Sequence, residues 1–177
     1  METIVRRGQP HEWQQVRALR LTALRDPDAA VAFLDALDDA ENRDDAFWQA
    51  RTTGASSGDG AAQFIALRGE TWVGTAAGLT RDAGSIDHLD RPVTAARVDV
   101  VGVYVHPDAR GARVIDQLLD AIAEWTRQLG FSELTLDVHV DNGRAQAAYR
   151  RNGFVESGAR FTGPIGPELE MVRPLSS

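Results

Sequence analysis

The chain has 177 residues, and its 26 acidic and 19 basic residues give a net charge of -7. All 19 basic residues are arginine, and cysteine is absent. These absences exclude a lysine Schiff base, a P-loop lysine, a cysteine nucleophile, disulfides and cysteine-ligated zinc.

The length is typical of one ordinary domain, so we expect residues 1–177 to form a single domain. The amino terminus carries no apolar signal segment, and no run approaches the ~18 apolar residues of a membrane span. We therefore expect a cytoplasmic protein that does not bind membranes.

The amino-terminal third is predicted to hold a short strand and two helical regions. The strand covers residues 3–5, and apolar residues at three- and four-residue steps predict an amphipathic helix over residues 12–25. The second helical region is interrupted and covers residues 29–37 and 45–51. Five apolar residues there are expected to face inward: Phe33, Leu34, Leu37, Phe47 and Trp48.

The middle of the chain changes from helical to strand periodicity. Residues 63–67 and 71–79 are separated by three turn-forming residues and predict a hairpin. Residues 82–94 are polar and predict a loop. The valine-rich residues 96–105 predict a central strand, which Pro107 ends.

The carboxy-terminal half contains the strongest helical pattern, over residues 114–129. A strand over residues 133–140 and a short helix over 143–151 follow. Residues 158–167 contain glycine and proline and predict a connection, and residues 168–172 predict a last strand. This order indicates an α/β fold with a mixed central sheet of six or seven strands and about four helices.

The junction between the central strand and the long helix has a shape that suits phosphate. A strand, a turn over residues 106–112 and a helix amino terminus expose several N–H groups in one direction, at the positive end of the helix dipole. Arg110 and Arg113 flank this turn and can add charge-assisted contacts to the same anion. A simple tight turn without a ligand is the alternative interpretation.

Four short motifs follow one another in this half of the chain: Val103–Pro107, Arg110–Ile115, Asn142 and Ala148–Phe154. In this order they resemble the GNAT superfamily of N-acetyltransferases. The strong part of the resemblance covers about a third of the chain. It implies a GNAT-type fold, acetyl-CoA as cosubstrate, no metal, and direct transfer of the acetyl group to an amine.

The resemblance also implies where acetyl-CoA binds. The cosubstrate would lie in a gap between the strands predicted at residues 96–105 and 133–140, and the amides from Gly111 to Ile115 would hold its pyrophosphate. The cosubstrate-binding residues implied in this way are Val103, Tyr104, Val105, Arg110, Gly111, Ala112, Arg113, Val114, Ile115 and Asn142. Asn142 is also a good candidate for a helix cap.

Two catalytic residues are expected. Tyr149 matches the family's residue that donates a proton to the departing thiolate, which suits a hydroxyl with an ordinary pKa near ~10. Asp99 is the candidate base that removes a proton from the amine, directly or through a water molecule. His139, at the end of the next strand, is another candidate base.

Two residues depart from the family's phosphate-binding pattern. Arg113 stands where the motif expects glycine, and Ile115 where it expects glycine or alanine. Because larger side chains there can hold phosphate away from the backbone, a catalytically silent acyl-CoA sensor of the same fold is one alternative. An α/β interaction domain without a CoA site is another.

The negative charge is concentrated in one segment. Residues 26–70 hold ten acids and three arginines, which accounts for the whole net charge. This segment either attracts a cationic acceptor, a small-molecule or peptide amine, or only keeps the protein soluble. The one basic excess, in residues 1–25, is too small for a nucleic-acid interface. A homodimer is plausible.

Overall fold

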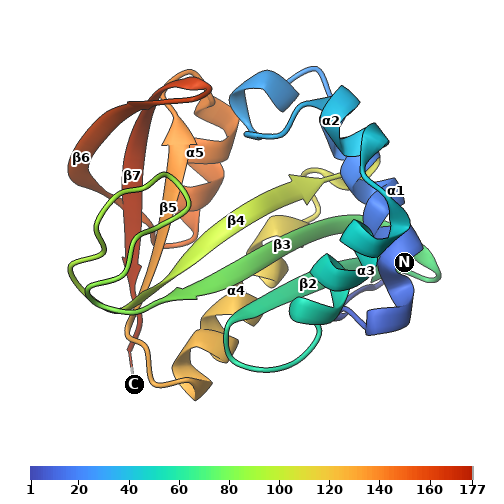
Figure 1. The fold of residues 1–177 in the computed structure, drawn as a ribbon, viewed down its shortest axis with the longest axis horizontal. Helices are drawn as coiled ribbons and strands as arrows, with labels where there is room; N and C mark the ends of the chain where they lie inside the picture. The colour runs from blue at the N-terminus through green and yellow to red at the C-terminus, as the bar shows by residue number, and fades with distance from the viewer. Residues whose placement is uncertain (177) are drawn as a thin grey trace.

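The computed structural model describes residues 1–176, which form a seven-stranded sheet flanked by helices (Figure 1). The strands are β1 (Thr3–Arg7), β2 (Ala61–Arg68), β3 (Thr71–Arg81), β4 (Arg97–Val105), β5 (Glu133–His139), β6 (Val155–Gly163) and β7 (Gly166–Pro174). Their order in the sheet is β1-β2-β3-β4-β5-β7-β6, and every neighbouring pair is antiparallel except β4 and β5.

Five α-helices cover the two faces of this sheet. They are α1 (Trp13–Leu24), α2 (Leu37–Asn42), α3 (Asp45–Gly54), α4 (Val114–Gln128) and α5 (Gly143–Arg151), with short 3-10 turns at Pro10–Glu12, Ala29–Val31 and Pro107–Ala109. The predicted α/β class, the mixed sheet and the element order are confirmed. Among the described residues, no helix combines the length and the apolar character needed to cross a bilayer.

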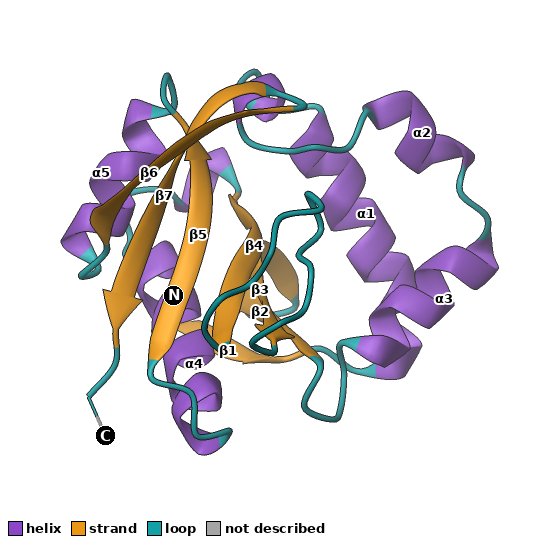
Figure 2. Cartoon of the chain, turned by 60° about the vertical axis from the view of Figure 1, so that its left-hand side comes forward, coloured by secondary structure: helices purple, strands orange, loops and turns teal. Residues whose placement is uncertain are grey.

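The helices on the two faces build separate cores. Helix α4 buries Leu118, Leu119 and Ile122 completely against the sheet. It approaches closely because β3 carries glycine beneath it: a Cβ at Gly78 would lie 3.0 Å from the ring of Trp125. Helices α1, α2 and α3 lie on the other face around a second core, as Figure 2 shows.

The central parallel pair of strands separates soon after it begins. Strand β4 pairs with β5 only at Val98↔Leu134 and Asp99↔Thr135. Further along, the pairing of β4 with β3 shifts register, and Gly102 has a φ of +61° within this bulge. A bulge bends its strand, so the edge of β4 that faces β5 is left without a strand partner beyond Asp99. This opening was predicted from the family resemblance.

Two predictions about local structure were wrong. Residues 158–167 are not a connection, because β6 continues to Gly163 and β7 starts at Gly166. Gly158, with a φ of +94°, lies where the pairing of β6 with β7 shifts register, so it marks a bulge in an edge strand and not the end of the strand.

The second helical region also differs from its prediction. Most of residues 29–37 is irregular, with a 3-10 turn before α2. Phe33 and Trp48 are buried as expected, whereas Leu34 and Phe47 are exposed. The start of α3 was predicted correctly, because Asp44 caps it by accepting a hydrogen bond from the Phe47 amide at 2.9 Å.

Candidate functional site

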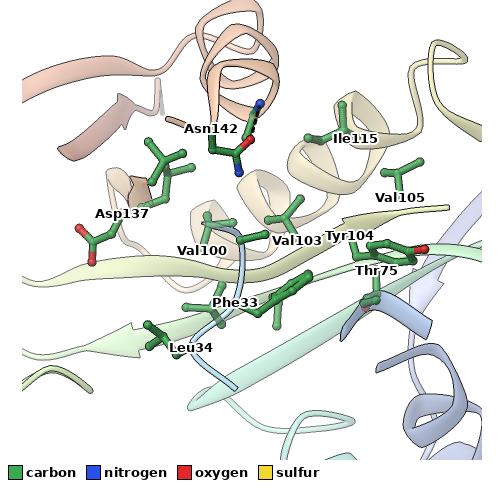
Figure 3. Close-up of a pocket in the computed structure, with 18 of the residues that line it drawn as sticks. Phe33, Leu34, Thr75, Val100, Val103, Tyr104, Val105, Ile115, Asp137 and Asn142 are labelled. Atoms are coloured by element: carbon green, nitrogen blue, oxygen red, sulfur yellow. Dashed lines mark hydrogen bonds between the residues drawn. The ribbon is translucent and has the colours of Figure 1, made fainter. Parts of the chain in front are cut away.

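A cavity of about 970 Å³ lies where β4 and β5 separate. Its walls come from β2 to β5 and β7, from α1, α3 and the segment between α1 and α2, and from the amino termini of α4 and α5. Figure 3 shows part of this lining. In that view Asp137 lies at the opposite end of the cavity from Tyr104. Eleven of the twelve predicted site residues line the cavity, and Ala112 does not.

The predicted phosphate turn joins β4 to α4 with an unusual backbone. Gly111 has a φ of +78° and Arg113 a φ of +60°, directly before the first turn of α4. A left-handed conformation costs a residue with a side chain about 1–2 kcal/mol, which explains the family's preference for glycine at position 113. The amides from Gly111 to Ile115 precede or form the first turn of α4, where N–H groups lack partners within the helix.

The side chain of Arg113 does not fill the turn. It is 80% exposed and its Nε donates to Asp116 at 2.8 Å. Asp116 also accepts from Arg151 and Asn152. Burial alone would raise the pKa of Asp116, but these hydrogen bonds outweigh it and hold the pKa below its ordinary value. Ile115 packs partly into the core beneath α4.

Arg110 is engaged within the protein. Its guanidinium donates to Asp26 at 2.6 Å and to the carbonyl oxygen of Val105 at 3.0 Å. Burial would raise the pKa of Asp26, but hydrogen bonds from the Asp28 amide and from Arg110 together lower it. Arg110 therefore joins the end of α1 to the end of β4, and its predicted contact with phosphate stays a prediction.

Asn142 caps α5, as its sequence position suggested. Its Oδ1 accepts from the Ala145 amide at 3.3 Å, and its Nδ2 donates to the carbonyl oxygen of Val31 at 3.4 Å. Two residues further on, Arg144 pairs with Asp28 at 2.9 Å. The segment between α1 and α2 is thus tied to the predicted CoA-binding segment at several points.

Tyr149 lies in the wall of the cavity with its ring edge-on to Phe154, at a centroid distance of 5.8 Å. Only 8% of the residue is exposed, and this burial raises the pKa of its hydroxyl. Among residues 1–176, no hydrogen-bond partner of that hydroxyl is present. The hydroxyl therefore stays protonated at neutral pH and is not already committed to another group.

Asp99 is placed less favourably for a base. One of its carboxylate oxygens accepts from Arg97 at 2.7 Å and the other from Arg81 at 3.2 Å. Both oxygens are therefore already engaged by arginine side chains, and neither is free to contact an amine without displacing one.

A second acidic group was missed in the sequence. Glu168 on β7 pairs in register with His139 on β5, and both residues are buried in the cavity wall. Among residues 1–176, the buried Oε2 of Glu168 has no hydrogen-bond partner, and it rests on Gly163, where any Cβ would overlap it. Burial is the main cause that raises the pKa of Glu168, and the negative charge of Asp137 raises it further.

In the sequence, acidic and apolar residues alternate from Glu168 to Met171, and this pattern could have indicated that the acidic side chains share one face of a strand. His139, the other candidate base, accepts a hydrogen bond at Nδ1 from the Asp141 amide at 3.0 Å. A neutral ring in this position carries its proton on Nε2.

The loop between β3 and β4 is held against the same wall by Arg91. This guanidinium pairs with Asp137 at 2.6 Å and with Asp87 at 2.8 Å, and it stacks on the ring of Phe161 at 4.2 Å. Burial raises the pKa of Asp137, although Arg91 opposes this effect. His88, in the same loop, lines the cavity.

One group of side chains has the spacing of a metal site. Ligand atoms of Asp87, His88 and Asp99 all lie within 4.8 Å of one another. Both carboxylates already accept from arginine side chains, however. Guanidinium groups at this distance repel a divalent cation, so the group does not fit a metal ion.

The model of the "Acetyltransferase (GNAT) family" matches residues 13–154. An IAA acetyltransferase of Azospirillum brasilense is 36% identical over 80 residues, which are 44% of this chain and 51% of that protein. An aminoglycoside N(6')-acetyltransferase type 1 of Stenotrophomonas maltophilia is 43% identical over 56 residues, 32% of this chain and 37% of that protein. The chain thus spans about half or less of these two curated relatives.

The fold also matches solved structures. A GNAT superfamily phosphinothricin acetyltransferase of Sinorhizobium meliloti, solved with acetyl-CoA, has a TM-score of 0.75 at 19% identity, over 99% of this chain and 90% of that one. At this identity the match establishes the shared fold and leaves the substrate open.

Proposed function

Because the chain belongs to the acetyltransferase (GNAT) family, we propose that it transfers the acetyl group of acetyl-CoA directly to a primary amine. One observation carries this proposal: the edge of β4 opens beside the amino terminus of α4, and Tyr149 lines the same cavity. The names of the two curated relatives give different acceptors, IAA and an aminoglycoside, and neither is selected here.

Main-chain groups would hold the cosubstrate. We infer that the pantetheine arm lies along β4, where Val103 and Val105 have no partner on the side of β5. The amides from Gly111 to Ile115 would hold the pyrophosphate, because a helix amino terminus offers free N–H donors and a favourable dipole. Arg110 and Asn142 would border this path.

The reaction needs an oxyanion site, an acid and a base. As the amine nitrogen bonds to the thioester carbon, negative charge develops on the carbonyl oxygen, and N–H groups on the free edge of β4 would stabilise it. The carbon–sulfur bond then breaks. Tyr149 would donate its proton to the leaving thiolate, which its position in the cavity wall and its unengaged hydroxyl support.

The base must accept the proton that the amine loses. Glu168 suits this task better than Asp99, because its buried Oε2 is unpartnered and its pKa is raised, whereas both oxygens of Asp99 are engaged by arginines. A base with a raised pKa holds the proton more readily near neutral pH. We propose Glu168, acting directly or through a water molecule, with Asp99 as the alternative.

The tests separate this proposal from its rivals. Acetyl-CoA is expected to raise the melting temperature, because a ligand that binds the native state stabilises it. Thiol release from acetyl-CoA is then measured with a panel of primary amines. Stabilisation without thiol release for any amine would favour the catalytically silent acyl-CoA sensor. That alternative arises because Arg113 and Ile115 are larger than the residues that the family's motif expects. No stabilisation at all would favour an interaction domain.

A homodimer and a cytoplasmic location stay predictions. Sedimentation of the purified protein would test the first, and microscopy of the tagged protein in its host would test the second.

A further inference from the structure

The charges that line the cavity are almost completely paired within the protein. Six arginines and five acids contribute to the lining, and nine of these eleven side chains form ion pairs. Within residues 1–176, the two without an ion pair are Arg51 and Glu168. One is a cation and the other an anion, so the lining offers one free site for each sign of charge.

Arg51 lies on α3 and faces the open cavity. Its side chain is exposed to solvent, and the protein around it lowers its pKa through burial. The guanidinium carbon lies 5.8 Å from the centroid of the Trp48 ring. Within residues 1–176 this guanidinium has no hydrogen-bond partner, and a carboxylate matches its geometry.

A neighbouring arginine strengthens the positive potential at this end. Arg20 on α1 stacks on Phe33 at 4.6 Å, and its Nε is buried without a partner. Burial lowers the pKa of Arg20, and the positive charge of Arg51 lowers it further. Asp35 gives little compensation, because Arg43 engages both of its oxygens at 2.7 and 2.8 Å and leaves Arg20 a contact of 3.4 Å.

The free anion lies across the sheet from this positive end. Glu168 is on β7, whereas α3 packs on β2, and three strands separate β2 from β7 (Figure 2). At ~4.8 Å per strand, β2 and β7 lie ~19 Å apart, which is too far for an α-amino acid to span. The side chains of Arg51 and Glu168 both line the cavity and cover part of this distance, so an extended chain of about three residues, ~10 Å long, has a suitable length.

The acids of residues 26–70 do not supply a cation site in this cavity. Asp26 and Asp28 are the members of that segment that line it, and both are paired with arginines. Within the described residues, the acids of this segment therefore give no support for the cationic acceptor that its charge suggested.

From this separation of charge we infer that the acceptor is a zwitterion, with its amine on the side of Glu168 and a carboxylate several bonds away bound by Arg51. A short peptide with a free carboxy terminus and an ω-amino acid both have this chemistry. The inference rests on the proposed function for the amine, but the carboxylate site is tested separately.

The first test compares acceptors that differ only in the carboxylate. Tri-alanine is expected to be acetylated with a kcat/KM about 10- to 100-fold above that of tri-alanine amide, the range for a hydrogen bond to a charged group. Arg51→Gln should bring this ratio close to one, and Arg51→Lys should retain part of it. Arg17→Gln is the control, because Arg17 lies on α1 outside the cavity lining. Equal rates for acid and amide in the wild type overturn the inference.

The second test needs no turnover. In the presence of CoA, calorimetry measures the Kd of N-acetyl-tri-alanine and of its carboxamide. We expect the wild type to bind the acid at least 10-fold more tightly than the amide. We expect Arg51→Gln to bind the two with similar affinity. Equal affinities overturn the carboxylate site even if amines are acetylated. Preferential binding of the acid without any turnover keeps this site and contradicts the proposed activity instead.

Chain length identifies the source of the zwitterion. A rate that rises from alanine to tri-alanine, and exceeds that of 6-aminohexanoate, supports a peptide. A rate with 6-aminohexanoate that exceeds the rate with tri-alanine supports an ω-amino acid. A preference for spermidine over every carboxylate-bearing amine overturns the inference.

Discussion

The two ends of the cavity are built by different means. At the turn before α4, backbone amides of consecutive residues form the candidate site, and the nearby charges of Arg110, Arg113 and Arg151 are neutralised by aspartates of the same chain. At the proposed acceptor end, side chains from α3 and β7 form the candidate site, and within residues 1–176 Arg51 and Glu168 have no ion-pair partner. A cosubstrate common to a family suits a backbone site, whereas side chains can change from one acceptor to another.

The largest expected effect concerns the acceptor end. Glu168→Gln should lower kcat about 100-fold, because it removes the proposed base. The acidic limb of the pH profile of wild-type kcat/KM should reflect the raised pKa of Glu168 and be absent in the variant. Glu156→Gln, on the exposed part of β6, should behave as wild type.

The same substitution should stabilise the fold. The pKa of Glu168 in the folded state lies above its ordinary value, so folding holds its proton and the free energy of unfolding falls as the pH rises through that pKa. Glu168→Gln removes this penalty, and urea unfolding at pH 8 should show a higher free energy of unfolding. A variant that is both inactive and less stable would indicate a structural role.

Low pH should destabilise the loop between β3 and β4, which lies beside the acceptor end. Burial would raise the pKa of Asp87, but hydrogen bonds from Arg91 and Leu89 lower it to about 2. Its contribution of about 2 kcal/mol is therefore present above pH 4 and lost as the pH falls toward 2. The difference in unfolding free energy between wild type and Asp87→Asn should shrink over that range, and a constant difference would contradict the assignment.

The ion pair that joins the end of α1 to the end of β4 can be broken at Arg110. Arg110→Met leaves the carboxylate of Asp26, which is 5% exposed, without its ion-pair partner, and should cost about 1–3 kcal/mol in urea unfolding. Arg25→Met removes a pair in which both side chains are over 40% exposed, with Glu41, and should cost at most about 0.5 kcal/mol. Similar losses of unfolding free energy in the two variants would show that the Arg110–Asp26 pair stabilises the fold no more than the exposed pair does.

The smallest expected effect is at the phosphate turn. Gly111→Ala should destabilise the protein by about 1–2 kcal/mol, whereas Arg113→Gly should relieve a similar left-handed strain. Acetyl-CoA affinity, measured by calorimetry, should fall in the first variant and be retained or improved in the second. A large loss of affinity in Arg113→Gly would mean that the arginine itself contacts the phosphates.

The sequence predicted the cosubstrate end much better than the acceptor end. The motifs from Val103 to Phe154 are local, so the strand, turn and helix could be placed without tertiary information. Glu168 opens the last predicted strand, but its place in the cavity wall depends on its register with His139 of β5, which the sequence does not reveal. The pairing of Arg110 with Asp26 joins residues 84 positions apart, and no local pattern reports such a contact.

The central claim is that Tyr149 protonates the leaving thiolate in a cavity that binds acetyl-CoA. The most direct test is Tyr149→Phe, with kcat measured by thiol release and the Kd for acetyl-CoA by calorimetry. We expect kcat to fall about 100-fold or more while the Kd and the melting temperature stay within about twofold and a few degrees of wild type. An unchanged kcat would contradict the claim.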